Sequence, residues 1–382
     1  MPLFAAHAIL TPEGLRDGLV LETDEAGVVV ALRVPHPDEK PEMLNGVLIP
    51  GLVNAHCHLE LSALKGMISP GTGMAGFIRQ VVGIRKEISQ QEREAAVLRE
   101  MDRLYAAGTQ LVGDISNDAT SLTAKTGHSL TTHTFVEVLG LVPERAGPAL
   151  ATAREVEAAF HGAGLAASLT LHAPYSVSEE LVKQFWQKPP AAVSIHLMES
   201  VEEMQYFTDL TGPLAAAFLA MGLPLPPVAG LRPDEWVWAH APQHQRGLAV
   251  HLTEAQPTDL ERLMSRFPNL YFGLCPRSNG YIHGTMPDIE RLWPWRDRIC
   301  LGTDSLASNA DLDVWQEALA LQDAFPWLPP EDLLQALTLN GARALGLAHR
   351  YGAFVEGATP GVVLLEHWKP DMRLGGEVRR VG

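Results

Sequence analysis

Residues 46–62 read GVLIPGLVNAHCHLELS, an apolar run that ends in a group of polar side chains. The run predicts a buried strand that carries His56 and His58 at its C-terminal end. Successive side chains of a strand point to opposite faces, so residues two apart share a face and both imidazoles can reach one ion. The first strand of the expected fold therefore ends in half of a candidate metal site.

Further apolar runs follow at intervals and alternate with helical stretches. The strand candidates are TQLVGDI, LTTHTFVEVLG, AASLTLHA, AVSIHL, GLAVHL, LYFGLC and RICLGTD. Helices are expected at 76–107, 146–162, 201–221, 259–267 and 331–346. Eight strand-then-helix units in about 300 residues predict an α/β fold with a closed parallel (β/α)8 barrel at 48–346, and an open doubly wound sheet is the alternative. The connection SNDATSLTAKTGHS is short and polar, so that unit is expected to be poorly formed.

Both ends of the chain have β-like patterns instead. Residues 1–47 contain LFAAHAIL, GLVLETD and GVVVALRV, and residues 347–382 contain GAFVEGATPGVVLLEHW. Neither end has a helical period. We expect the two ends to meet as one small β-sandwich domain.

Composition excludes several classes of protein. The formal net charge of −16 argues against nucleic acid and anionic membrane partners, because an acidic surface repels phosphate groups. The three cysteines form no CxxC pair, and no apolar run approaches about 18 residues. MPLFAAHAILTPEG does not resemble a signal peptide. A cytoplasmic protein with a small-molecule substrate is expected.

Two more strand ends complete the candidate metal site. The fifth strand ends in SIHLMES with His196 and the eighth in LGTDSLASN with Asp304. A lone HxH among 15 histidines would be a weak signal, but three polar insertions fall at strand ends where the loops of a barrel converge. Three imidazoles and one carboxylate suit Zn²⁺, with Fe²⁺ and Mn²⁺ as alternatives, and leave a position for water.

These motifs resemble those of a known family. NAHCHLELS, SIHLMES and LGTDSLASN are similar to the metal-and-acid motifs of the amidohydrolase superfamily, most closely its cytosine-deaminase-like and chlorohydrolase-like branch. CPRSN at 275–279 and HAPYSVS at 172–178 resemble the seventh-strand and fourth-strand motifs of that branch, and the resemblance covers nearly the whole chain. The fourth strand offers His172 and no lysine for a bridging carbamate, so the resemblance implies one metal ion. The resemblance is also compatible with a homodimer.

The expected reaction is hydrolytic deamination. Asp304 would ligate the metal and accept a proton from water, and Glu199 would protonate the ring nitrogen next to the attacked carbon and then help ammonia to leave. A helix-start residue is the alternative for Glu199. A histidine of the sixth strand should hold the attacking water. His251 in RGLAVHLTE fits that place by its spacing, with His240 as the alternative, and His244 is expected in a loop.

Substrate contacts come only from the resemblance, which implies Glu60, His172, Arg277, Ser278 and Asn279. Glu60 would accept hydrogen bonds from ribose and Arg277 would bind a carboxylate, and a structural ion pair is the alternative for both.

HLELS, CPRSN and GTDSLASN look most like the bacterial 6-aminodeoxyfutalosine deaminases of menaquinone biosynthesis, whose substrate joins an adenine nucleoside to a benzoate. Adenosine, S-adenosylhomocysteine or guanine deamination, s-triazine dehalogenation and a non-enzymatic scaffold are the alternatives. GTGMAG at 71–76 is read as a loop and helix start, because no strand precedes it as a dinucleotide site requires.

Overall fold

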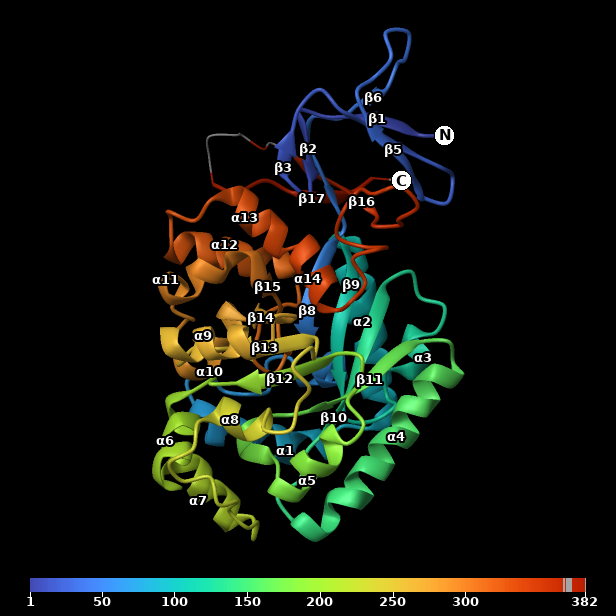
Figure 1. The fold of residues 1–382 in the computed structure, drawn as a ribbon. Helices are drawn as coiled ribbons and strands as arrows, with labels where there is room; N and C mark the ends of the chain where they lie inside the picture. Colours follow the sequence, from blue (N-terminus) through green and yellow to red (C-terminus); the bar gives the residue numbers. More distant parts are fainter. Residues whose placement is uncertain (367, 369–372, 382) are drawn as a thin grey trace.

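The computed structural model describes residues 1–366, 368 and 373–381, and parallel strands flanked by helices form its centre (Figure 1). One sheet has the order β11-β10-β9-β8 and a second the order β12-β13-β14-β15, with every pairing parallel. The first comprises β8 (Leu52–Cys57), β9 (Thr109–Ser116), β10 (Thr131–Val138) and β11 (Ala166–Leu171). The second comprises β12 (Val193–Leu197), β13 (Gly247–His251), β14 (Leu270–Leu274) and β15 (Ile299–Leu301).

The two sheets are hydrogen-bonded to each other at both edges. Beyond the end of β15, the N–H groups of Thr303 and Asp304 donate to the carbonyl of His56, at 3.0 and 3.1 Å. At the other edge, the N–H of His196 donates to the carbonyl of His172 at 3.0 Å. The C-terminal ends of both sheets therefore surround one region, where the polar strand ends meet.

Helices connect the strands and cover their outer faces (Figure 1). The α-helices are α1 (Gly73–Arg85), α2 (Gln90–Ala106), α3 (Leu122–Lys125), α4 (Ala146–Gly162), α5 (Glu179–Trp186), α6 (Val201–Asp209), α7 (Gly212–Ala220), α8 (Pro233–Val237), α9 (Pro257–Arg266), α10 (Pro276–His283), α11 (Ile289–Leu292), α12 (Val314–Ala324), α13 (Pro330–Ala336) and α14 (Leu339–Ala344). The 3-10 helices are η1 (Leu59–Leu64), η2 (Pro143–Arg145), η3 (Pro174–Ser176) and η4 (Trp293–Arg298). The short α3 confirms that the unit after β9 is poorly formed.

Three helices expected to be continuous are each divided. The stretch 76–107 becomes α1 and α2, 201–221 becomes α6 and α7, and 331–346 becomes α13 and α14. The first break lies before Ser89, whose hydroxyl accepts the N–H of Glu92 while the Glu92 carboxylate accepts the N–H of Ser89. The second follows Leu210, which has a left-handed backbone with φ 57°. Local capping and turn chemistry thus overrides the longer apolar period.

Strands from both ends of the chain gather at one end of the molecule (Figure 1). They are β1 (Leu3–Ala5), β2 (Ala8–Thr11), β3 (Gly14–Arg16), β4 (Val20–Thr23), β5 (Val29–Arg33), β6 (Glu42–Met43), β7 (Gly46–Pro50), β16 (Val362–Glu366) and β17 (Val378–Arg380). They form sheets in the orders β5-β4-β1-β6 and β17-β16-β7-β2-β3. One apolar cluster joins both sheets, with Phe4 and Leu21 from the first against Leu48 and Leu364 from the second.

The run 46–56, expected as one strand, is divided at Gly51. β7 pairs with β2 and β16, whereas β8 begins the central sheet, so the boundary expected at residue 47 falls inside β7. A Cβ atom on Gly51 would lie 2.6 Å from the carbonyl oxygen of Pro360, so glycine allows the chain to cross between the sheets. Part of the expected C-terminal segment, at 367, 369–372 and 382, lies outside the described residues.

Cys57, Cys275 and Cys300 are buried and unpaired. Within residues 1–366, 368 and 373–381, no helix is long and apolar enough to cross a membrane.

Candidate active site

The structure brings the four predicted metal ligands together. The Nε2 atom of His58 lies 3.2 Å from Nε2 of His56 and 3.2 Å from Nε2 of His196. Oδ1 of Asp304 lies 3.3 Å from Nε2 of His58 and 3.8 Å from Nε2 of His56. All four side chains are buried.

This spacing fits a bound cation. Ligand atoms about 2.1 Å from a tetrahedral zinc ion lie about 3.4 Å from one another. Two neutral imidazoles can share one N–H···N hydrogen bond at such a distance, but three Nε2 atoms and a carboxylate oxygen gathered around one point are a donor set that suits a cation. Burial lowers the pKa of His58 to about 3, which keeps the imidazole neutral as metal ligation requires.

Three of the four ligands are oriented by a second hydrogen bond. Nδ1 of His196 donates to the carbonyl of His172 at 2.9 Å, which leaves Nε2 free of a proton. Nδ1 of His56 lies 3.0 Å from the hydroxyl of Ser194. Oδ2 of Asp304 accepts the hydroxyl of Ser278 at 2.6 Å, which leaves Oδ1 for the metal.

Glu199 lies between two histidines next to these ligands. Its Oε1 atom is 3.6 Å from Nε2 of His251, at the end of β13, and 3.6 Å from Nε2 of His283, at the end of α10. Burial raises the pKa of Glu199, but His251 and His283 lower it by more, so the net pKa lies below its usual range. The ligand-free protein therefore presents Glu199 as a carboxylate that can receive a proton.

A cavity of about 260 Å³ opens above these groups. His58, His196, Asp304, Glu199 and His251 all line it, together with His172. One wall is apolar and is formed by Met74, Phe77, Ile78, Val81 and Val82 of α1, with Leu61, Leu139, Tyr175 and Phe218 around it. The metal donors, the acid and a ligand-sized space thus share one location.

The side of the cavity next to the first sheet is polar. Oε1 of Glu60 pairs with Arg85 at 3.1 Å, and Oε2 accepts the N–H of Asn117 at 2.9 Å. Burial raises the pKa of Glu60 to about 7 although Arg85 lowers it. Oε2 of Glu137 accepts the side-chain amide of Asn117 at 2.8 Å, whereas its Oε1 is buried and has no hydrogen-bond partner among the described residues. These groups can meet the hydroxyls of a ligand.

A second set of donors shares one residue with the first. Glu137, His172 and His196 could also surround an ion. A second ion would need Nδ1 of His196, which already donates to the His172 carbonyl, so this set favours one metal over two.

Sequence comparison identifies the family. The sequence model of the Amidohydrolase family matches residues 47–374. The chain belongs to the amidohydrolase family. The resemblance seen in its motifs and the predicted class of hydrolytic enzyme are confirmed.

Relatives of this amidohydrolase act on nucleosides according to their names. An aminodeoxyfutalosine deaminase of Deinococcus radiodurans is 26% identical over 392 residues, covering 96% of this chain and 90% of the relative. An adenosine deaminase of Helicobacter pylori is 27% identical over 336 residues, covering 85% and 80%. The crystal structure of Helicobacter pylori aminofutalosine deaminase with methylthio-coformycin shares the fold, with a TM-score of 0.82, 22% identity and coverage of 97% and 93%.

Three expected substrate contacts of this amidohydrolase have other partners. Arg277 binds the Asp311 carboxylate at 2.7 and 3.0 Å, as the ion-pair alternative anticipated. Ser278 holds Asp304, and Oδ1 of Asn279 lies 3.3 Å from Nδ1 of His251. Within the described structure none of the three lines the cavity, and their direct contact with a substrate stays a prediction.

The alternative sixth-strand histidine is also placed elsewhere. WVWAH does not end a strand, because α8 occupies Pro233–Val237 and His240 follows it, exposed. His251 ends β13 and lines the cavity. His244 lies in the connection between α8 and β13, as expected.

Sequence reasoning missed His283, Glu137 and Arg85. His283 follows Asn279 by four residues on α10, a spacing that places both on one helix face, so CPRSN and the next turn contained the signal. Glu137 ends an apolar strand, as the expected ligands do, and could have been found in the same way.

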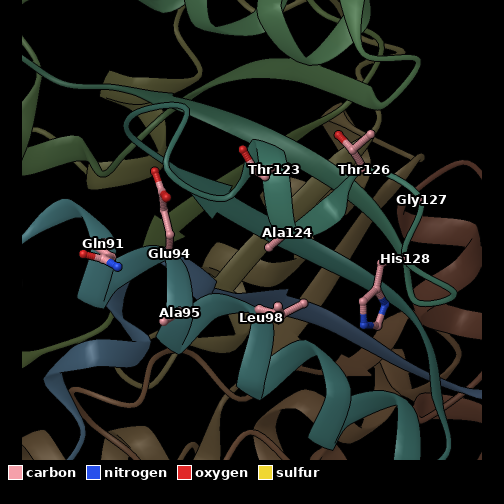
Figure 2. A pocket seen from close by; sticks show the side chains of 9 residues that line it. All are labelled: Gln91, Glu94, Ala95, Leu98, Thr123, Ala124, Thr126, Gly127 and His128. Carbon is pink, nitrogen blue, oxygen red and sulfur yellow. The ribbon is translucent and has the colours of Figure 1, made fainter.

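A larger hollow elsewhere does not compete with this site. It measures about 450 Å³ and lies between α2 and the segment around α3 (Figure 2). Its one histidine, His128, is 3.1 Å from Asp102. Both donor clusters found among the described residues lie at the other site.

Proposed function

We propose that this amidohydrolase hydrolyses the exocyclic amino group of an adenine-type nucleoside and releases ammonia, with 6-aminodeoxyfutalosine as the first candidate substrate. The position of Glu199 carries the proposal, because a proton-transferring acid lies beside four metal donors and lines the same cavity. The names of the two relatives point to the same substrate class.

The fold would be a closed (β/α)8 barrel at 48–346 with a β-sandwich made from 1–47 and 347–382. Support comes from the hydrogen bonds at both sheet edges and from the apolar cluster shared by the terminal sheets. Active sites of such barrels lie at the C-terminal strand ends, as the donors do here.

One divalent ion, Zn²⁺ first and Fe²⁺ or Mn²⁺ as alternatives, would be held by His56, His58, His196 and Asp304 and would lower the pKa of water from about 16 towards about 7. Asp304 accepts a proton from the attacking water, since Ser278 holds its other oxygen in place. His251 orients that water through Nε2, which has no hydrogen-bond partner in the described structure, while Asn279 holds Nδ1.

Glu199 carries the proton to the substrate. Because it is ionised in the ligand-free protein, it takes one proton from the attacking water and delivers this proton to the ring nitrogen beside the attacked carbon, while the oxygen of the water bonds to that carbon. Asp304 accepts the second proton of the water and passes it to the amino group, the carbon–nitrogen bond breaks and ammonia leaves. Both protons of one water molecule are accounted for, one on the ring nitrogen and one on ammonia.

The test measures ammonia release by the Zn²⁺-loaded protein from 6-aminodeoxyfutalosine, adenosine, S-adenosylhomocysteine, guanine and cytosine. Glu199→Gln should lower kcat by at least about 100-fold, the lower end for loss of a general acid–base group. Glu180→Gln, at an exposed helix position, is the matched control and should be unchanged. Full activity in Glu199→Gln would overturn the mechanism.

Adenosine is the second candidate, because the Helicobacter pylori relative carries that name. Turnover of another panel member would keep the mechanism and change the substrate. If no compound of the panel releases ammonia, dehalogenation, another amidine or amide substrate, or a different metal ion becomes the favoured explanation. A scaffold would also bind no metal after purification and stay inactive on reconstitution.

A further inference from the structure

The side chain that would meet a charged substrate group is Arg85. Arg277 is engaged by Asp311 outside the cavity. Among the described residues that line the cavity, Arg85 alone is an arginine or lysine.

Arg85 ends an apolar stripe of α1. Met74, Phe77, Ile78, Val81 and Val82 line the cavity and recur every three or four residues, and Arg85 is the next position on that face. At 1.5 Å per residue the stripe runs about 16 Å from Met74 to Arg85. A ligand lying along it meets apolar surface first and a cation at the end.

Arg85 also lies on the side of the cavity away from the proton-transferring acid. Glu199 and His251 follow strands of the second sheet, whereas Glu60 and Asn117, which contact Arg85, follow β8 and β9 of the first. A nucleoside whose base meets Glu199 can therefore extend its substituent towards Arg85.

One of the present partners of Arg85, the Asp118 carboxylate, can exchange. Its second guanidinium nitrogen bonds Oδ2 of Asp118 at 3.0 Å, and Arg93 bonds the same oxygen at 3.1 Å. The other oxygen of Asp118 accepts the N–H of Thr120 at 2.8 Å. Asp118 is 41% exposed, so it stays paired and hydrated when Arg85 turns to a ligand.

We propose that Arg85 binds the carboxylate of the substrate in place of Asp118, and that the enzyme selects nucleosides whose substituent is apolar or aromatic and ends in a carboxylate. This inference rests on the proposed function and names its substrate class. The α1 stripe packs against the apolar part, and the guanidinium forms paired hydrogen bonds with the carboxylate.

The test compares 6-aminodeoxyfutalosine with its benzoate methyl ester, which has the same shape without the charge. Arg85→Gln should lower kcat/KM for the acid by about 30-fold or more and for the ester by less than about 3-fold. Arg85→Lys keeps the positive charge but lacks the paired N–H donors of the guanidinium. It should lower kcat/KM for the acid by an intermediate factor and leave kcat/KM for the ester unchanged. Arg93→Gln, the other partner of Asp118, should not discriminate between the two compounds.

Calorimetric binding of the deaminated acid should show the same dependence on Arg85 without turnover. Equal losses for acid and ester in Arg85→Gln would mean that Arg85 only positions Glu60, and a wild type that prefers the ester would also overturn the inference. Failure of the proposed function looks different, because the wild type would then turn over no nucleoside at all.

Discussion

Several residues of the site have a backbone conformation that side chains rarely adopt. Met198, His251 and Asp304 have φ values of 50, 75 and 58°, in the left-handed region. Such residues cost free energy and persist where surrounding bonds fix them, and they are common at functional sites. Here the three residues follow β12, end β13 and follow β15, next to Glu199 and the metal donors.

Glu203 fixes one of these bends. Its carboxylate accepts the N–H groups of Met198 at 3.1 Å and Glu199 at 2.9 Å, and it is fully buried. In Glu203→Gln an amide group would face one of these donors. We expect the free energy of unfolding to fall by about 1–3 kcal/mol and kcat to fall by about 10-fold, because Glu199 loses its position.

Urea unfolding and steady-state rates measure both effects of Glu203→Gln, with Glu180→Gln as the control. An unchanged kcat at reduced stability would show that Glu203 does not position Glu199.

The sequence predicts the positions of some residues of the site and not of others. His56, His58, His196 and Asp304 follow from one rule, that polar groups at the ends of parallel strands converge. Arg277 could not be placed, because its partner Asp311 is 34 residues away and pairing in space leaves no local pattern.

At the scale of elements, the break between α1 and α2 was missed although the sequence contains its signal. SQQE at 89–92 is a capping box, which the apolar period across 76–107 obscured. Ser89→Ala should lower the free energy of unfolding by about 1 kcal/mol and leave kcat unchanged. Ser129→Ala, outside the helices and strands, serves as the control, and equal stability of the two variants in urea would contradict the cap.

Glu317 of α12 bonds to two segments of the chain, at Arg277 and Asn309, and makes the free energy of unfolding depend on pH. Its carboxylate accepts the N–H of Arg277 at 2.9 Å and the amide of Asn309 at 2.7 Å. Burial raises the pKa of Glu317 from 4.5 to about 8, against the lowering effect of these bonds. Between these values the folded protein keeps a proton that the unfolded chain has lost.

The free energy of unfolding should therefore fall as pH rises from about 4.5 to 8, by at most about 1.4 kcal/mol per pH unit for this group. Urea unfolding at pH 5, 6, 7 and 8 gives the free energy of unfolding at each pH. Its decrease with rising pH should be shallower in Glu317→Gln than in the wild type. The exposed Glu290→Gln should keep the wild-type slope, and identical slopes in all three proteins would refute the assignment.

At the scale of the whole molecule, the alternation of strands and helices and the β pattern of both ends could be read from the sequence. The place where the chain passes between sheets could not, because GVLIPGLVNAH is one apolar run and the close neighbours of Gly51, Gln110 and Pro360, are distant in the sequence. A contact between residues so far apart in the chain has no signal in the local pattern.

Arg380 of β17 joins the C-terminal strand to the central strand β9, and its replacement would measure how much this contact stabilises the protein. Its guanidinium donates to the carbonyl of Thr109 at 2.9 Å and to Oε1 of Gln110 at 2.7 Å, and lies 3.8 Å from the ring centre of Tyr105. Its neighbour Arg379 points to the other side of the strand and pairs with Glu366 while 52% exposed. The two arginines are thus a matched pair, because the contacts of Arg380 are partly buried and those of Arg379 are exposed.

Arg380→Ala should lower the free energy of unfolding by about 2–3 kcal/mol, because it removes charge-assisted hydrogen bonds and leaves the Thr109 carbonyl without this donor. Arg379→Ala should cost less than about 1 kcal/mol, since an exposed ion pair contributes little. Both should keep the wild-type kcat, because neither residue lines the cavity in the described structure. Equal stability of the two variants in urea would mean that the terminal sheets add no stability to the central strands through this contact.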